Sequence, residues 1–514
     1  MTFALTYAEQ NPDQIAIRDE RKSLHWSEVD DVLNRAVNGL RAYDLGPDVR
    51  VAVFAENSVE TALANLGGLV AGASVVPVNF HLTAEEVAYI LSASGARVLF
   101  VGPETAARGV EAAANSGVHT VVGWCDAEGV LEWNGWLAGN SADQPDHGVP
   151  PKPNLLYTSG TTGRPKGTEL PPTMFAGGET IDEHLALFRE RTLARIPAGA
   201  EIGAQLVVGP MYHTGPLSAT RQLIAGVPSV ILSRFNAENT LAAIEQFQIE
   251  STLMVPTHFV RLLALPQDVR EKYDISSMKS ISHTGSKCPV DVKREMIEWF
   301  GPVFLDAYGA SEVGTTCMIT SEEWLAHPGS VGKAIPPFTA LILDDEDNEL
   351  PPNTEGRLFF KDATGRGVVY HNDPEKSAEA HIAPGVFTLG EIAYVNEEGY
   401  VFITDRFSDM VVSGGVNIYP AEAEQVLIEH PDILDVACIG IPHPVMGEEL
   451  KAMVILKDNS LDAQAAEIIA FCRSKLSHYK CPRTVDFVDD LGRNTMGKIN
   501  KRKLRAPFWE GHSD

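Results

Sequence analysis

Several features are scarce in this chain of 514 residues, and each scarcity excludes a class of protein. The six cysteines are scattered without a CxxC pair, which argues against a disulfide framework or a zinc site and predicts reduced thiols. The most apolar stretch, residues 66–78, is interrupted by glycines and is shorter than the ~20 residues that a membrane span needs. Basic residues are outnumbered, and the formal charge of −28 argues against nucleic acid or an anionic membrane as a general partner.

The beginning of the chain also lacks a targeting pattern. Its first residues contain no basic segment followed by a long apolar run, so we expect no signal peptide and a cytoplasmic location. The chain is longer than one hydrophobic core usually supports, which predicts at least two domains. A polyanionic substrate would need a local basic patch in a protein this acidic.

The first part of the chain alternates between strand and helix patterns. Residues 51–54, 75–78 and 98–101 are predicted strands, and residues 59–71 are a predicted helix with a cap at Asn57-Ser58. Thr83 and Glu86 form a capping box for a second helix that ends near residue 94. This alternation is typical of a parallel sheet covered by helices.

The same pattern returns later, and polar or glycine-rich segments follow the strands. Predicted strands at 206–209, 252–255, 280–282 and 303–305 are followed by the segments 212–215, 256–258, 283–286 and 306–309. Ligands of open α/β sheets bind beyond the carboxyl ends of the strands, so we expect these segments to converge on one site. Residues 328–400 have the short strands and turns of a small β subdomain, and a further α/β unit follows Asp405, with a helix at 421–428.

The segment Tyr157–Gly167, with the sequence YTSGTTGRPKG, has the composition of a phosphate-binding loop. Its glycines allow backbone N–H groups to approach an anion, and Lys166 adds a positive charge. The spacing is not that of the GxxxxGK[ST] loop, because Pro165 precedes Lys166, so a different nucleotide-binding fold is implied. A flexible surface turn is the alternative. The residues that supply hydroxyls or turns are Thr158, Ser159, Gly160, Thr161, Thr162 and Gly163.

Three further clusters have the chemistry of a nucleotide site. Residues 306–312 place the Glu312 carboxylate beside a hydroxyl, which suits Mg²⁺ and phosphate. Residues 388–391, 405–406 and 413–422 combine carboxylates, an arginine and paired glycines that could hold a sugar and allow close backbone approach. Residues 494–498 place Lys498 on a loop that contains a glycine. Taken singly, Glu312 and Lys498 are more often solvated surface residues.

In this order, the four clusters resemble the adenylate-forming superfamily of acyl- and aryl-CoA synthetases, adenylation domains and beetle luciferases. The resemblance runs from about residue 5 to residue 505. It implies an α/β fold with a large N-terminal domain, residues 1–404, made of two α/β subdomains and a β-barrel-like subdomain. A small, mobile α+β C-terminal domain, residues 405–514, would follow a hinge at Asp405.

The resemblance also implies a role for each matching position. The catalytic set would be Lys498, Glu312, Thr162 and Lys166, with Glu312 as the Mg²⁺ ligand. The nucleotide would be bound by Thr158, Ser159, Gly160, Thr161, Gly163, Gly285, Ser286, Tyr308, Gly309, Ser311, Glu391 and Arg406. The acyl pocket would involve His213, Thr214, His258, His283 and Ala310. The hinge and the face for coenzyme A would involve Asp405, Gly414 and Gly415.

Some positions depart from the family's pattern. Leu389-Gly390-Glu391 stands where the family usually has Thr-Gly-Asp, which moves the carboxylate by about 1.5 Å but keeps two acceptor oxygens. Ser311 replaces the commoner threonine and keeps the hydroxyl. The stretch 167–172 replaces the usual Val-x-His at the expected wall of the acyl pocket. None of these changes removes a catalytic position.

The predicted activity is that of an acid–thiol ligase that uses ATP, Mg²⁺ and coenzyme A. A carboxylic acid would be activated to an acyl-adenylate and then transferred to the thiol of coenzyme A, whose phosphates would bind the basic residues Lys475, His478, Lys480, Arg483 and 501–505. The alternatives are an adenylating enzyme that acylates a carrier protein or an amine, and a non-catalytic nucleotide- or acyl-binding relative. The sequence allows a homodimer and does not select among fatty, aryl and sterol-derived acids.

Overall fold

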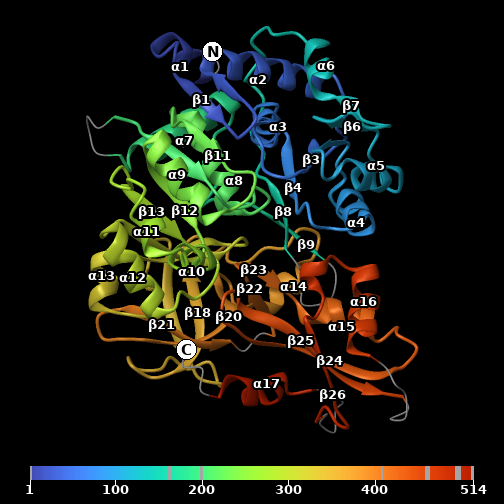
Figure 1. The fold of residues 1–514 in the computed structure, drawn as a ribbon, viewed down its shortest axis with the longest axis vertical. Helices are drawn as coiled ribbons and strands as arrows, with labels where there is room; N and C mark the ends of the chain where they lie inside the picture. Colours follow the sequence, from blue (N-terminus) through green and yellow to red (C-terminus); the bar gives the residue numbers. More distant parts are fainter. Residues whose placement is uncertain are drawn as a thin grey trace.

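The computed structural model describes residues 3–158, 165–196, 201–406, 409–457, 464–492 and 499–510, apart from the side chains of Thr158, Asp405 and Arg406. The chain starts at the top of Figure 1, and its C-terminal elements lie in the lower half. Within the described segments, no helix has the length and apolar character that crossing a bilayer requires.

The first sheet is parallel and has the strand order β4-β3-β5-β6-β7. Its strands are β3 (Arg50–Phe54), β4 (Ser74–Val78), β5 (Val98–Val101), β6 (Thr120–Gly123) and β7 (Leu131–Glu132). The connecting helices are α3 (Val59–Val70), α4 (Ala84–Ser94), α5 (Ala106–Ala114) and α6 (Trp133–Ala138). As predicted, Ser58 caps α3, and Thr83 with Glu86 forms a capping box for α4. We call this unit the first α/β part.

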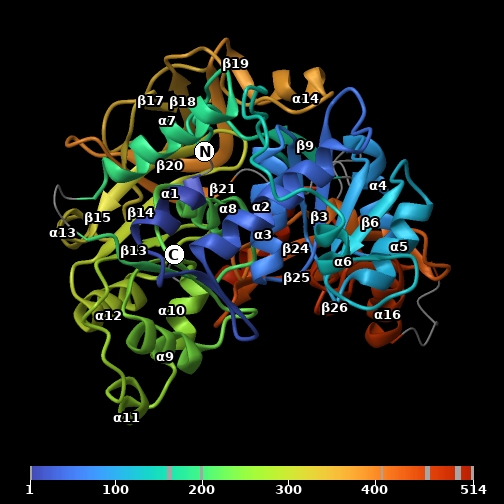
Figure 2. The ribbon, with the colours of Figure 1, turned by 90° about the horizontal axis from the view of Figure 1, so that it is seen from above.

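The second sheet has a parallel half that carries most of the candidate site. Its strands are β1 (Ile15–Arg18), β10 (Ala204–Val207), β11 (Ser229–Ile231), β12 (Ile249–Met254), β13 (Ser280–His283) and β14 (Phe304–Ala310), with β2 (Ser23–His25) antiparallel at the edge. Helices α9 (Ala237–Phe247), α10 (Pro256–Leu263), α11 (Gln267–Arg270) and α12 (Val290–Phe300) accompany these strands. Figure 2 shows these helices on one side of the molecule and the first sheet on the other.

The antiparallel half continues the same sheet by hydrogen bonds rather than standing apart from it. It contains β15 (Gly314–Thr320), β16 (Gly332–Ala334), β17 (Phe338–Leu343), β18 (Gly356–Asp362), β19 (His381–Ala383), β20 (Val386–Val395) and β21 (Tyr400–Arg406). Helices α13 (Ser321–Ala326) and α14 (Pro374–Glu379) lie in its connections. This half is the counterpart of the predicted β-barrel-like subdomain.

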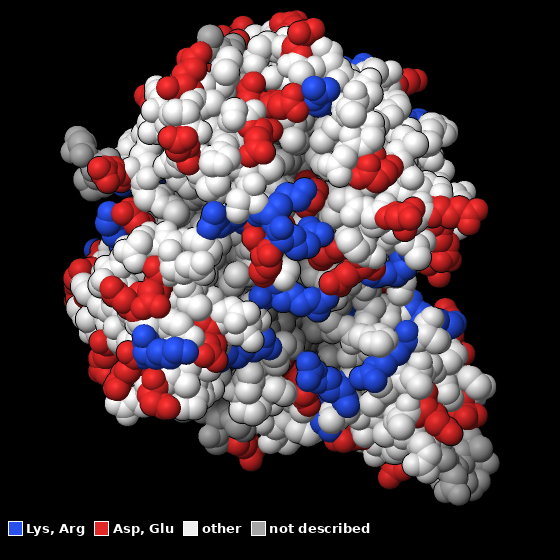
Figure 3. All heavy atoms as spheres, turned by 45° about the horizontal axis from the view of Figure 1, so that its top comes forward, with Lys and Arg blue, Asp and Glu red and all other residues white. Residues whose placement is uncertain are grey.

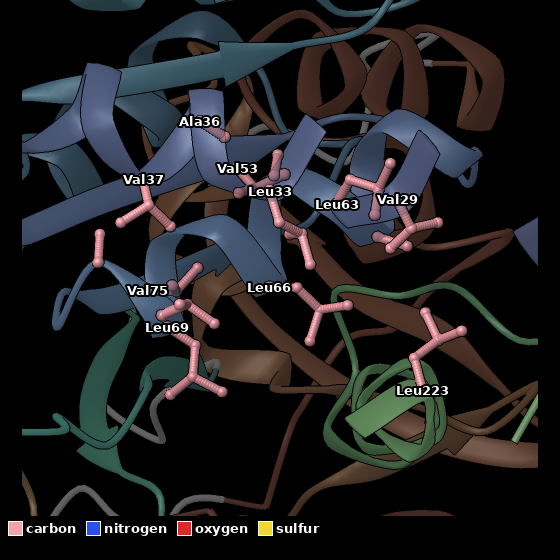
Figure 4. Packing of buried hydrophobic residues seen from close by; sticks show 14 of the residues in the cluster. Val29, Leu33, Ala36, Val37, Val53, Leu63, Leu66, Leu69, Val75 and Leu223 are labelled. Carbon is pink, nitrogen blue, oxygen red and sulfur yellow. The ribbon is translucent and has the colours of Figure 1, made fainter. Parts of the chain in front are cut away.

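The remaining N-terminal elements join the two sheets. They are α1 (Phe3–Gln10), α2 (Trp26–Arg41), α7 (Ile181–Leu193), α8 (Thr214–Thr220), the 3₁₀ helix η1 (Arg221–Ala225) and the hairpin β8 (Leu155–Thr158) with β9 (Lys166–Glu169). Figure 4 shows Leu33 of α2 and Leu66 of α3 packed together, with Leu223 of η1 facing the same cluster. Burial of these leucines removes apolar surface from water and fixes the first sheet against the second.

A third sheet forms most of the C-terminal part, by which we mean the described residues from 409 onward. Its strands are β22 (Val411–Ser413), β23 (Val416–Ile418), β24 (Ile433–His443), β25 (Gly447–Leu456) and β26 (Thr484–Phe487). Its helices are α15 (Pro420–Leu427), α16 (Ala465–Lys475), the 3₁₀ helix η2 (His478–Lys480) and α17 (Lys501–Trp509). The buried members of two apolar clusters come from this part alone, so it has its own core.

All six cysteines lie in the described segments, and none forms a disulfide. Five are buried and Cys125 is partly exposed. Burial raises the pKa of Cys288 and that of Cys317 to about 12. The prediction of reduced thiols therefore agrees with the fold.

Two predicted loops belong to regular structure instead. Residues 306–309 lie inside β14, because β15 turns back antiparallel and extends the pairing as far as Ala310 and Gly314. Residues 256–258 form the first turn of α10, where Pro256 occupies the position at which its missing N–H costs nothing. These two polar segments therefore lie on regular elements, whereas residues 212–213 and 284–286 lie in turns and loops.

Candidate active site

The predicted phosphate loop connects the two strands of a hairpin. Tyr157 pairs with Gly167 and Thr158 with Lys166, while the side chains of Leu155 and Leu156 are buried. The connecting residues Ser159, Gly160, Thr161, Thr162 and Gly163 lie outside the described residues, as does Lys498. The strand predicted to lead into the loop is present, and the roles of these six residues stay predictions.

Lys166 is held by a segment that the sequence analysis did not connect with it. Its Nζ atom lies 2.7 Å from Oδ2 of Asp373, and this bond lowers the pKa of the Asp373 carboxyl. The backbone N–H of His371 donates to the carbonyl of Gly167 at 2.7 Å, and Thr168 donates its hydroxyl to the carbonyl of Val369 at 2.9 Å. In this structure the charge of Lys166 is therefore engaged by a carboxylate.

Strand β14 carries the predicted adenine and phosphate residues in sequence. Tyr308 lies on this strand with its ring centroid 6.1 Å from that of Phe360. Gly309 lies at an irregularity in the pairing, where a Cβ atom would come within 2.0 Å of the carbonyl oxygen of Gly314, so only glycine fits. Ala310 ends the strand, and the Ser311 hydroxyl follows, 3.2 Å from that of Thr214 at the start of α8. Two segments 97 residues apart thus meet here.

Glu312 lies beside Ser311 and is 8% exposed. Its backbone carbonyl accepts a hydrogen bond from Arg366 Nη1 at 3.1 Å. Burial raises the pKa of the neighbouring Tyr370, and the charge of Glu312 raises it further. No group of three metal-ligating side chains occurs in the described part of the chain, but a Mg²⁺ ion bound to nucleotide needs only one or two protein carboxylates. The role of Glu312 as a Mg²⁺ ligand therefore stays a prediction.

The two residues predicted to bind ribose face one another across a strand pair. Glu391 on β20 is opposite Arg406 on β21, and Ile392 is opposite Asp405. Glu391 is 4% exposed. The backbone register brings the carboxylate and the arginine positions together, and it places the predicted hinge residue at the end of a paired strand.

His213 precedes α8 with its ring centroid 4.3 Å from that of Tyr212. Burial lowers the pKa of His213 to about 4, and the nearby His81 contributes to the same shift. At neutral pH this imidazole is therefore uncharged, as suits the wall of an acyl pocket.

The other two predicted acyl-pocket histidines pack against aromatic side chains. The His258 ring stacks on Phe235 at 4.0 Å with an interplanar angle of 6°, and burial lowers its pKa to about 3. His283 is fully buried, with its ring edge-on to Phe259 at 5.3 Å, and burial lowers its pKa to about 4. A core-packing role explains both contacts, and their role in acyl binding stays a prediction.

Asn57 is a residue whose position at the site the sequence analysis missed, because it was interpreted only as part of a helix cap. Its side-chain amide donates to the carbonyls of Gly209 at 2.8 Å and Leu232 at 3.2 Å, and its oxygen accepts from the N–H of Met211 at 2.8 Å. The side chain is 4% exposed. Asn57, which follows β3 of the first sheet, therefore holds in place the segment of the second sheet that leads to His213.

The glycine turn at 414–415 lies against the ends of the second sheet. A Cβ atom on Gly415 would be 3.1 Å from Val255 Cγ1, and one on Gly285 would be 3.7 Å from the Gly415 carbonyl oxygen. Both glycines have positive φ angles, 80° and 93°. The C-terminal part thus brings its paired glycines to the loop that contains Gly285 and Ser286.

Two residues of the expected basic patch for coenzyme A are engaged elsewhere, which corrects that prediction. Lys480 is 2% exposed and forms ion pairs with Glu86 and Glu422. Lys475 lies 2.5 Å from Glu429. Lys480 is therefore buried and does not offer the free basic surface that the sequence suggested, whereas Lys475 stays at the surface beside an exposed carboxylate.

Two α/β units followed by a C-terminal part with its own core form the architecture that the resemblance to adenylate-forming enzymes implies. An AMP-binding enzyme family model matches residues 5–368, and an AMP-binding enzyme C-terminal domain model matches residues 422–498. A fatty acid–[acyl-carrier-protein] ligase of Streptomyces coeruleorubidus is 30% identical, covering 98% of this chain and 95% of that protein. A feruloyl-CoA synthase of an Amycolatopsis species is 32% identical, covering 98% and 97%. The chain belongs to the AMP-binding enzyme family.

Solved structures share the fold over nearly the whole chain. An amide bond synthetase from Marinactinospora thermotolerans has a TM-score of 0.83 at 22% identity, covering 99% of this chain and 100% of that one. A double mutant of o-succinylbenzoate CoA synthetase from Bacillus subtilis with a product analogue scores 0.79 at 23% identity, covering 98% of both chains. The same synthetase with its acyl-adenylate scores 0.64 at 23% identity, covering 98% and 97%. At these identities the likenesses show a shared fold.

Proposed function

We propose that this protein is an ATP-dependent ligase that joins a carboxylic acid to coenzyme A. The acid attacks the α-phosphorus of ATP, pyrophosphate leaves, and the acyl-adenylate then reacts with the thiol of coenzyme A to release AMP. The observation that carries the proposal is the AMP-binding family match, together with relatives named as CoA ligases that cover nearly the whole chain. The activity of an acid–thiol ligase follows from these relationships.

In the first step two anions must meet, so the site has to neutralise charge at the phosphates. We assign this task to Lys498, to the hydroxyls and N–H groups of residues 158–163, and to Glu312 as the group that would hold Mg²⁺. Bound Mg²⁺ would supply further charge neutralisation. The contact between the Ser311 and Thr214 hydroxyls, at 3.2 Å, supports a place for the α-phosphate beside the acyl pocket.

In the second step the thiol of coenzyme A attacks the acyl carbon and AMP leaves. The charge of Lys498 is no longer needed in this step. We propose that residues 1–404 and 405–514 are the two domains and that the second turns about Asp405 between the steps. The separate sheet and core of the C-terminal part support this division. The position of Gly415 beside Gly285 supports the described arrangement as that of the thiol step.

Positive charge near the contact between the parts supports a polyphosphate acceptor. Burial lowers the pKa of His81, and the charges of Arg234 and Arg108 lower it further, while Glu104, the ion-pair partner of Arg234, raises it. The His81 ring lies 6.3 Å from that of Tyr479 in the C-terminal part. Figure 3 shows Lys and Arg side chains around a hollow across the middle of one face, although the net charge is −28.

The identity of the acid is tested with a panel. Ferulate, indole-3-acetate and dodecanoate represent acids of the kinds named for the relatives. Pyrophosphate release is measured for each acid with and without coenzyme A, and the acyl-CoA is quantified by mass. An acid that gives stoichiometric AMP and acyl-CoA supports the proposal, whereas release of pyrophosphate without any thioester contradicts it.

A carrier protein is the second candidate acceptor, because one of the relatives is an acyl-carrier-protein ligase at 30% identity. The same panel, run with a phosphopantetheinylated carrier protein in place of coenzyme A, separates the two. Faster acylation of the carrier than of coenzyme A at equal concentration would favour this alternative. An amine acceptor, the activity named for a protein of the same fold, would give an amide with neither thiol present.

A further inference from the structure

A buried cluster of charged side chains joins the C-terminal part to the first α/β part. Lys480 Nζ lies 2.8 Å from Glu86 Oε1 and 2.6 Å from Glu422 Oε2. Ser477 donates its hydroxyl to Glu86 Oε2 at 2.6 Å. The three charged side chains are between 2% and 11% exposed, so the contact is shielded from water and from salt.

The two carboxylates belong to different parts of the molecule. Glu422 is on α15, in the same part as Lys480, and therefore keeps its partner wherever that part moves. Glu86 is in the first turn of α4, in the first α/β part. Of the two ion pairs of Lys480, only the one with Glu86 depends on how the parts are arranged.

The charge of Lys480 is what keeps Glu86 ionised. Burial alone would raise the pKa of the Glu86 carboxyl, but Lys480 and hydrogen bonds from Ser477 and Thr83 outweigh burial and lower it. Burial raises the pKa of Glu422 despite the same lysine. An ion pair of this kind is costly to break by removing one partner, because a charge is left without compensation.

Neighbouring contacts dock the same segment. The Nδ2 atom of Asn79 donates to the hydroxyl of Tyr479 at 3.1 Å. The Tyr479 ring packs against the apolar cluster of the first sheet and also against the core of the C-terminal part. Residues 477–480 therefore rest on residues 79–86, and the views of Figures 1 and 2 agree that the C-terminal elements lie beneath the first sheet.

This docking fixes the place of the glycine turn. Strand β22, which leads into Gly414 and Gly415, pairs with β25, and Val411 shares one core with Cys481. Residues 477–480 and the glycine turn are thus on one packed unit. The contacts that hold residues 477–480 on α4 therefore also hold the glycine turn at Val255 and Gly285.

We propose that Glu86 is a positioning residue for the thioester-forming step, holding the C-terminal part through Lys480 in the arrangement that puts the 414–415 turn at the site. This inference rests on the proposed function. For the adenylation step, in which Lys498 would approach the nucleotide, the C-terminal part has to turn, and the bond between Glu86 and Lys480 has to open.

The test is Glu86→Gln, assayed on the two half-reactions separately. Acid-dependent exchange of pyrophosphate into ATP reports the first, and conversion of supplied dodecanoyl-adenylate or feruloyl-adenylate with coenzyme A reports the second. We expect the second rate to fall about tenfold, a usual size for the coupling between two arrangements, while the first stays within about twofold or rises. Ser477→Ala should shift the rates in the same direction by a smaller factor.

Glu323→Gln is the matched control, because Glu323 forms the same capping box with Thr320 on α13 and has no described contact with the C-terminal part. It reports the cost of weakening a helix cap, together with one bond from the Tyr400 hydroxyl within the N-terminal part. Equal losses in both half-reactions, or a second rate for Glu86→Gln equal to that of Glu323→Gln, would overturn the inference and leave the proposed function standing. No thioester from the unmodified protein with the adenylate of an acid that supports its pyrophosphate exchange would overturn both.

Discussion

Replacing Asn57 by alanine should destabilise the protein and loosen the acyl-pocket segment. The side chain makes three buried hydrogen bonds, to the backbones of Gly209, Leu232 and Met211. At about 1 kcal/mol for each buried bond, Asn57→Ala should lower the free energy of unfolding by roughly 3 kcal/mol. Asn65, in helix α3 just after Asn57, is 5% exposed and donates one bond, to the Thr61 carbonyl at 2.8 Å. Asn65→Ala should therefore cost only about 1 kcal/mol.

The kinetic effect shows whether Asn57 positions the acyl-pocket segment or only stabilises the fold. We expect Asn57→Ala to raise the KM for the carboxylic acid about tenfold, because small displacements of positioning groups cost large factors in rate. The KM for ATP should change by less than about twofold, since the predicted nucleotide residues lie on other elements. Urea unfolding and initial rates on both variants provide the measurements. Equal destabilisation by Asn57→Ala and Asn65→Ala, or parallel rises in both KM values, would refute this reasoning.

Three further predictions concern single positions. Gly309→Ala places a Cβ atom 2.0 Å from a backbone oxygen and should lower pyrophosphate exchange at least tenfold, whereas Gly139→Ala, whose Cβ has 3.5 Å of room, should not. Burial lowers the pKa of His283 from 6.5 to about 4, so between these pH values the imidazole binds a proton in the unfolded state but not in the folded state. The free energy of unfolding should therefore fall by about 3 kcal/mol as the pH drops from 6.5 to about 4. His283→Leu should flatten this fall in urea titrations, and replacement of the exposed His119 should not. Lys498→Ala should cost roughly 3–4 kcal/mol in adenylate formation, measured by exchange, and leave conversion of supplied adenylate within about tenfold.

Elements with local signals could be predicted from the sequence nearly to the residue. The caps at Ser58 and Thr83 and the apolar runs beside them predicted β3, β4 and β5 with the helices that connect them. Each of these signals acts within a few residues. The family resemblance identified most candidate positions in the same way, by short motifs. The register places Glu391 opposite Arg406, and their contact with one sugar stays a prediction.

Features that depend on distant partners could not be predicted. The extension of β14 to Ala310 follows from pairing with β15, and strand propensity alone does not reveal a partner. The ion pair of Lys166 joins residues 207 positions apart, and that of Lys480 with Glu86 joins residues 394 apart. The surface lysine expected at 480 is therefore a buried one, because a carboxylate from another part of the chain covers it.

The burial of the thiols matters for an enzyme that would make reactive acyl groups beside a thiol acceptor. A thiol is nucleophilic as the thiolate, so Cys288 and Cys317, with pKa values of about 12, are poor acceptors for self-acylation. Cys125 is the one partly exposed thiol of the six. A maleimide dye should therefore attach at Cys125 in preference to the five buried thiols, and so label the first α/β part without mutagenesis.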